Sequence, residues 1–164
     1  MTLDKLAALD KLAALDELAA IEAIRQLKAR YFHCMDQKRW DDWANVFCED
    51  ARIDTTQEGS PLIESRQAFV DFLPPLLEGV KTVHHGHASE IRLTGQDSAE
   101  GTWSMEDHLW WPDGRHLWGT GFYFEKYRLE KDARSEHGQW RIQELVLRRI
   151  RTEVDGVQTF PPPA

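Results

Sequence analysis

The chain has 164 residues, of which 41% are hydrophobic and 29% are charged, and its formal net charge is −8. This length corresponds to about one domain of 100–200 residues, and the aromatic-rich composition excludes a disordered or collagen-like chain. The acidic balance argues against a general nucleic-acid or anionic-membrane binder. No apolar run approaches the ~20 residues of a membrane span, and Cys34 and Cys48 lack the spacing of a disulfide framework. We therefore expect a soluble cytoplasmic protein with reduced cysteines and with neither nucleic-acid nor membrane partners.

The N-terminus contains a six-residue repeat, LDKLAA, LDKLAA, LDELAA, which places Leu or Ile at every third position from Leu3 to Leu27. Its residue types favour a helix. Three residues turn a helix by about 300°, so the leucine row winds around the axis instead of forming a heptad seam. We predict that residues 1–20 are a helical extension, either peripheral and partly frayed or packed against another subunit.

A conventional amphipathic helix follows and continues to Asp36. Its apolar face is formed by residues at helical spacing: Ala20, Ile24, Leu27, Tyr31 and Cys34. A face of this kind is typical of a helix that packs on a core. Beyond it we predict a short helix from Asp41 or Asp42 carrying Trp43 and Phe47, a strand over 51–55, and a helix over 67–73 that ends at Pro74-Pro75.

Beyond Val80 the hydrophobic pattern alternates, which predicts four long strands, over 82–94, 99–111, 116–129 and 139–153. Turn residues separate them, most clearly in Trp111-Pro-Asp-Gly-Arg115. Gly119-Thr-Gly121 predicts a bend or bulge inside the third strand. Helices followed by an antiparallel meander indicate an α+β domain, over 21–155, with the helices packed on one face of a curved sheet. Residues 156–164 are predicted to be a Pro-rich tail.

Asp36 and Tyr31 are candidate functional residues because both lie at the end of the buried helix face. Asp is also common at helix ends, where its side chain bonds local backbone groups. A Tyr in an apolar stripe is equally consistent with core packing. The pattern alone leaves both interpretations open.

The run His84-His85-Gly86-His87 is the most unusual feature of the sequence. On a strand, His84 lies on one face, and His85 and His87 lie on the other. A neutral His suits proton transfer because its usual pKa is about 6.5. His85, His87 and Glu90 offer a metal-binding alternative, but no further ligand stands at a diagnostic spacing. We therefore predict no metal and no cofactor.

Arg149 shares a strand face with Leu145 and Leu147, so it either enters a pocket to meet a carbonyl or carboxylate or is an exposed Arg near the strand end. Trp103 and Trp118 belong to apolar sets that alternate along two strands. Without a basic stripe, these sets indicate core and pocket wall more than a nucleic-acid stacking platform.

Five segments resemble, in order, the SnoaL-like branch of the NTF2-like superfamily: IEAIRQLKARYFHCMDQKRWDDW, VHHGHASEI, WSMEDHLWWPDG, GFYFEKY and GQWRI. Within that branch, the sequence is most similar to bacterial bile-acid 7α-dehydratases and more distantly to scytalone dehydratases. The resemblance covers about residues 21–153. It implies a cone-shaped α+β barrel and a dimeric or trimeric homo-oligomer. It also implies a cofactor-independent dehydratase with a small apolar, carbonyl-containing substrate of steroid-like or polycyclic aromatic type.

The resemblance also implies roles for individual residues. His84 would take a proton from the carbon next to a carbonyl, and Asp36 would fix the tautomer of His84. Tyr31 would bond the developing enolate oxygen, and Arg149 would orient the substrate between the pocket walls Trp103 and Trp118. The same residues could serve an isomerase, a cyclase or a dehydrohalogenase. A cone of this kind could also belong to a non-catalytic protein that binds an apolar ligand.

Overall fold

The computed structural model describes residues 3–132 and 135–162. Its elements, in chain order, are α1 (Leu3–Asp36), α2 (Trp40–Ala44), β1 (Phe47–Asp54), the 3-10 helix η1 (Thr56–Glu58), α3 (Arg66–Leu76), β2 (Lys81–Leu93), β3 (Ser98–Trp110), β4 (His116–Asp132), β5 (Ser135–Val154) and β6 (Val157–Phe160).

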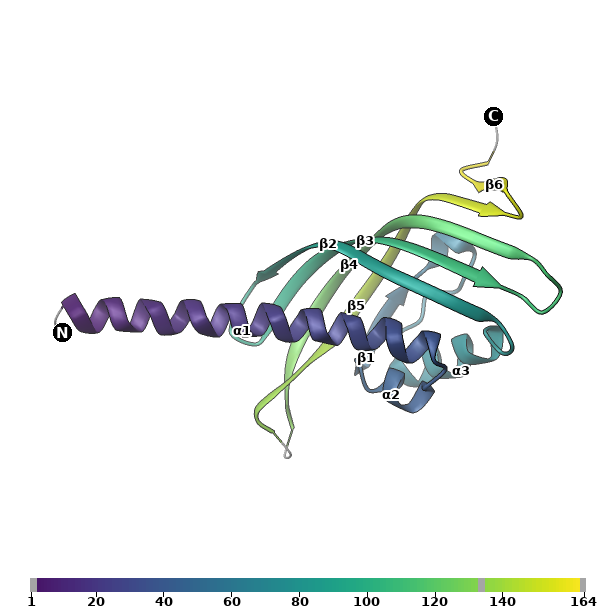
Figure 1. Ribbon diagram of the computed structural model, residues 1–164. Coiled ribbons are helices and arrows are strands. Elements are labelled where there is room, and N and C mark those ends of the chain that lie inside the picture. Colours follow the sequence, from purple (N-terminus) through teal and green to yellow (C-terminus); the bar gives the residue numbers. More distant parts are fainter. Residues whose placement is uncertain (1–2, 133–134, 163–164) are drawn as a thin grey trace.

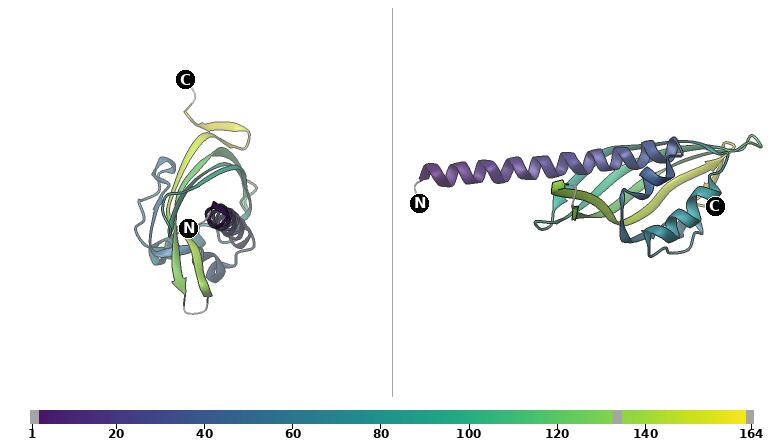
Figure 2. Two further views of the ribbon diagram at one scale, coloured as in Figure 1. Left: turned by 90° about the vertical axis from the view of Figure 1, so that its left-hand side faces the viewer. Right: turned by 90° about the horizontal axis from the view of Figure 1, so that it is seen from below.

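The strands form one curved mixed sheet in the order β1-β5-β4-β3-β2, with β6 paired to β5. β1 runs parallel to β5, and the other pairs are antiparallel. The second half of α1 lies in the concave side of this sheet, and α2 and α3 cover the end near β1 (Figures 1 and 2). The predicted α+β cone is therefore confirmed.

The predicted amphipathic face of α1 forms the centre of the core. Ile24, Leu27, Tyr31 and Cys34 are all buried against the sheet and α2. The helix ends at Asp36, and Lys38 follows with a positive φ of 60°. A non-glycine residue seldom adopts this left-handed conformation, and here it turns the chain away from the helix axis.

The first part of α1 projects beyond the sheet (Figure 1). Leu9, Leu12, Leu15 and Leu18 are 54–62% exposed because the winding leucine row has no sheet to meet there. α1 is unbroken from Leu3 to Asp36. The predicted extension and the domain are thus joined within a single helix.

The four long strands lie close to their predicted ranges. The register of β4 and β5 shifts at Thr120/Gly121, within the segment predicted to bend or bulge, but the extra residue, Ile150, lies in β5. A second register shift, at Lys126/Tyr127, changes which residues of β5 face the core. Trp140 and Ile142, which strict alternation from Leu145 would place on the opposite face of β5, are therefore buried in the same core.

Two end regions differ from the prediction. α3 continues through Pro74 and Pro75 to Leu76, because only the last turn of the helix loses N–H donors to proline. Residues 157–160 of the predicted tail form β6 and extend the sheet beside β5. Cys34 and Cys48 are buried and free. Within the described residues, no helix is long and apolar enough to cross a membrane.

Candidate active site

The end of α1 and the start of β2 bring Asp36 and His84 together. Asp36 Oδ1 lies 2.6 Å from His84 Nδ1, and Asp36 Oδ2 accepts a hydrogen bond of 3.0 Å from the His84 backbone N–H. The Thr82 hydroxyl donates to Asp36 Oδ1 at 2.9 Å. A carboxylate at Nδ1 holds the proton on that nitrogen, so Nε2 is the nitrogen that can act as a base.

The environment keeps Asp36 ionised. Burial by itself would raise the pKa of Asp36, but hydrogen bonds from the His84 ring, the His84 backbone and Thr82 together lower the pKa below its usual value. An anionic Asp36 stabilises a protonated imidazole. The pair therefore has the charge arrangement of a carboxylate-oriented general base.

His84 lies at the wall of a groove of about 300 Å³ between α1 and β2. Its side chain is 7% exposed, and its ring stacks on Phe32 with centroids 6.3 Å apart. Gly86 and Trp103 line the same groove. A Cβ atom at Gly86 would lie 2.6 Å from the Phe32 ring, so glycine allows the strand to approach α1 closely.

Arg149 is held by carboxylates of its own chain. Its guanidinium binds Asp107 through Nη1 at 2.8 Å and Nη2 at 2.7 Å, and its Nε donates to Glu58 at 2.7 Å. Asp107 is opposite His84 in the β2–β3 register, and its Oδ2 lies 4.0 Å from His84 Nε2. Burial would lower the pKa of Arg149, but these carboxylates raise it above its usual value. The structure thus directs Arg149 to Asp107 instead of to open groove.

Tyr31 lies deeper, in a buried aromatic cluster. Its ring contacts Phe32, and the ammonium of Lys28 lies 4.1 Å from its centroid. Lys28 Nζ is 2.5 Å from Glu125 Oε1, and the Tyr127 hydroxyl donates to the other oxygen of Glu125. Burial raises the pKa of Tyr31 far above its usual value, so its hydroxyl stays protonated and is a hydrogen-bond donor.

The fold and the sequence agree with one family. Residues 16–146 match the model of the SnoaL-like domain. The chain belongs to the SnoaL-like family. The predicted family resemblance is therefore confirmed, and with it the NTF2-like cone.

Solved structures with the same fold include three that cover most of this SnoaL-like chain. A candidate scytalone dehydratase from Novosphingobium aromaticivorans is 20% identical, with a TM-score of 0.73, over 83% of this chain and 87% of its own. LinA Type2, a hexachlorocyclohexane dehydrochlorinase, is 18% identical, with a TM-score of 0.74, over 92% of this chain and 99% of its own. Rv3472, a protein of unknown function from Mycobacterium tuberculosis, is 24% identical, with a TM-score of 0.68, over 82% of this chain and 73% of its own.

The two tryptophans predicted to form the pocket wall lie on different faces of this SnoaL-like sheet. Trp103 points into the cone, where its Nε1 donates to the Tyr127 hydroxyl at 2.8 Å. Trp118 instead donates from Nε1 to Glu106 at 2.7 Å, on the outer face. The structure therefore places Trp103 and His84, which Asp36 contacts, at the groove and separates Trp118 from it.

Three buried charged residues of the SnoaL-like core escaped the sequence reasoning: Lys28, Asp107 and Glu125. Each stands at a position that its periodicity marks as internal. Lys28 follows Ile24 by four residues, which places both on one helix face. Asp107 alternates with Trp103 and Met105 on β3, and Glu125 alternates with two tyrosines on β4. The spacing of each charged residue relative to its apolar neighbours could therefore have indicated from the sequence that it is buried.

Proposed function

We propose that this SnoaL-like protein is a cofactor-independent lyase that eliminates water from a small hydroxylated carbonyl compound, with His84 as general base. The observation that carries the proposal is the 2.6 Å contact of His84 Nδ1 with Asp36 Oδ1, in a ring that borders a groove. A protein that only binds an apolar ligand has no need of a base oriented by a carboxylate. Removal of the proton next to a carbonyl in a dehydration uses such a base.

The proposed reaction balances without an oxidant or a reductant. His84 Nε2 takes the proton from the carbon next to the carbonyl, and the C–H electron pair forms an enolate. The enolate then expels the hydroxyl from the neighbouring carbon, and the imidazolium returns the proton to it as water leaves. Asp36 stabilises the imidazolium between these steps.

Tyr31 is the proposed donor to the enolate oxygen. Its hydroxyl stays protonated at neutral pH, so it can donate a hydrogen bond to developing negative charge. A substrate that enters from the groove would have to pass Phe32, which contacts the rings of both Tyr31 and His84. Tyr31→Phe is expected to lower kcat more than it changes KM.

The substrate class rests on similarity. On the expectation, drawn from the sequence segments alone, of a likeness to bile-acid and scytalone dehydratases, we propose a steroid-like or polycyclic aromatic hydroxy-carbonyl compound. A candidate scytalone dehydratase and LinA, a dehydrochlorinase, share the fold. Dehydration and dehydrochlorination both remove a proton and a leaving group from adjacent carbons. The likeness to LinA therefore favours dehydrohalogenation as the second candidate, with isomerisation or cyclisation by the same base as further variants.

The test is a screen of hydroxylated carbonyl and chlorinated cyclic compounds, in which loss of water or of hydrogen chloride is followed by mass spectrometry. For an active compound, His84→Ala and Asp36→Asn should each lower kcat by about 10²- to 10⁴-fold. His116→Ala, at the start of β4 beside Trp110, is the matched histidine control and should keep full activity. Circular dichroism and the unfolding midpoint establish that each variant is folded.

The outcomes separate the competing functions. Turnover that survives both His84→Ala and Asp36→Asn contradicts the proposed base. Compounds that bind to the wild type but are returned unchanged across the whole screen would instead identify a binding protein.

A further inference from the structure

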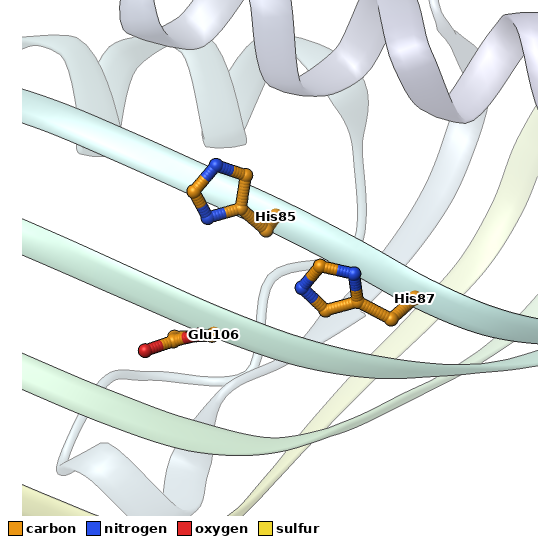
Figure 3. Close-up of side chains that lie close together, drawn as sticks. All are labelled: His85, His87 and Glu106. Carbon is orange, nitrogen blue, oxygen red and sulfur yellow. The ribbon is translucent and has the colours of Figure 1, made fainter.

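The side chains of His85 and His87 lie on the face of β2 opposite to that of His84, which is the outer face of the sheet. Both residues also border the groove beside His84. Both side chains are exposed, and their ring centroids are 5.7 Å apart. Glu106 lies directly opposite His85 in the β2–β3 register. One ligand atom from each of the three residues lies within 4.8 Å of the others (Figure 3).

This donor set has a specific chemistry. Two residues at positions i and i+2 share one face of a strand, and the directly opposed residue on the next strand is their nearest cross-strand neighbour. Two imidazoles and one carboxylate are a three-ligand set for Zn²⁺, which leaves a fourth tetrahedral position for water or an anion. Small rotations of exposed side chains would bring the three atoms to coordination distance.

We propose that His85, His87 and Glu106 form a Zn²⁺ site on the outer face of the sheet, separate from the Asp36–His84 site. Glu106, which pairs with His85, replaces Glu90 as the acidic ligand that the sequence pattern offered. Glu90 instead pairs with Thr102, four residues further along β3, and its carboxylate is not among the ligand atoms that lie close together.

The residues around Glu106 support its role as a ligand. Trp118 Nε1 donates to Glu106 Oε1 at 2.7 Å, which fixes the carboxylate on the outer face and leaves Oε2 for a metal. His108 Nε2 lies 3.6 Å from the same Oε1. Such partners, which hold a ligand without touching the metal, are typical of metal sites and raise their affinity.

A second cluster of similar composition does not offer free ligands. Cys48, Asp50 and Glu130 also lie close together, but Arg128 binds both carboxylates, and Arg141 binds Glu130 at 3.1 Å. Burial raises the pKa of the Cys48 thiol to about 12, so the thiol is protonated at neutral pH. The donors of this cluster are thus already in use, whereas no arginine or lysine pairs with His85, His87 or Glu106 in the contacts of the described residues.

A metal at this site would link the edge strand β2 to its neighbour β3. β2 is an edge strand and pairs with β3 alone among the described strands. Zn²⁺ bound by His85 and His87 from β2 and by Glu106 from β3 would hold the two strands together. Because the site forms only in the folded chain, Zn²⁺ should raise the unfolding temperature.

The experiment is isothermal titration of the full chain with ZnCl₂, with protein that carries no polyhistidine tag and has been treated with a chelator. We expect one Zn²⁺ per chain. His85→Ala, His87→Ala and Glu106→Gln should each weaken binding at least tenfold, on the order of the losses seen even for groups that only support ligands. Glu90→Gln is the matched acidic control and should bind like the wild type. MgCl₂ should give no binding, because Mg²⁺ prefers oxygen ligands.

Three results would overturn the site: no Zn²⁺ binding by the wild type, wild-type affinity in either histidine variant, or loss of affinity in Glu90→Gln but not in Glu106→Gln. The shift in unfolding temperature with ZnCl₂ is the second measurement. It should occur in the wild type and in Glu90→Gln and be absent in His85→Ala, and the metal-free unfolding temperature of each variant reports on folding.

Discussion

The buried ion pair between Lys28 and Glu125 links α1 to β4, and replacement of Lys28 by Met should strongly destabilise the protein. The two side chains are 1% and 0% exposed, with Lys28 Nζ 2.5 Å from Glu125 Oε1. The ammonium also lies 3.6 Å from the centroid of the Tyr123 ring. Lys28→Met retains most of the apolar stem of the side chain but removes the charge, so Glu125 remains buried without its cation.

The expected loss of unfolding free energy follows from the burial of both charges. Removal of one partner of a buried ion pair costs about 3–5 kcal/mol, because the remaining charge has lost its water and gained no replacement. The Tyr127 hydroxyl still bonds Glu125 Oε2, which favours the lower half of this range. Glu125→Gln alone leaves the ammonium unpaired and should cost a similar amount. The double variant leaves neither charge and should be more stable than either single variant.

Urea unfolding at pH 7, followed by tryptophan fluorescence, measures these free energies. Lys126→Met is the matched control. The Lys126 side chain is 60% exposed in its pair with Glu144, so its loss should change stability by less than about 1 kcal/mol. The reasoning is refuted if Lys28→Met costs no more than Lys126→Met, or if the double variant loses the sum of the two single losses.

Two further changes test the packing and charge of the sheet. Gly119→Ala would place a Cβ atom 2.5 Å from Arg149 Nη1 and 2.8 Å from Asp107 Oδ1, so it should cost about 1–3 kcal/mol in urea unfolding; an unchanged midpoint would contradict the tight packing. Asp54 accepts a hydrogen bond from Arg148 that lowers its pKa below the usual value, so the wild type should be about 1 kcal/mol more stable than Asp54→Asn at pH 7. Because the folded pKa lies below the unfolded value of ~3.9, this difference should stay constant above about pH 5 and shrink as the pH falls further; a difference that grows on acidification would contradict it.

Most of the fold was predictable because buried side chains recur at regular intervals along helices and strands. The apolar face of α1 and the alternation along β2 to β5 place side chains relative to their neighbours on the same element. The hydrophobic pattern does not predict the buried face where an extra residue in a strand interrupts the alternation. At the register shift at Lys126/Tyr127, an extra residue in β5 moved Trp140 and Ile142 to the core side.

The candidate site was predictable only in part, for a related reason. Alternation places Trp118, Phe122 and Phe124 on one face of β4, but it does not show whether that face is the concave one. Trp118 bonds Glu106 on the outer face, and there Phe124, which contacts Phe122, is 45% exposed. The contact of Asp36 with His84 was expected from resemblance. The engagement of Arg149 with Asp107 depends on the register of β3 against β4 and β5, which no local pattern contains.

Asp36 bonds the backbone of His84 as well as its ring, and this has a consequence for the edge strand β2. Side chains on a strand exchange faces when its register slips by one residue. Such a slip of β2 along β3 would send His84 outward and turn a neighbouring ring toward α1. The hydrogen bond from the His84 N–H to Asp36 Oδ2 ties β2 to the end of α1 and so opposes this slip. The Asp36 carboxylate at the end of α1 thus favours the register in which His84, and not His85 or His87, faces the interior.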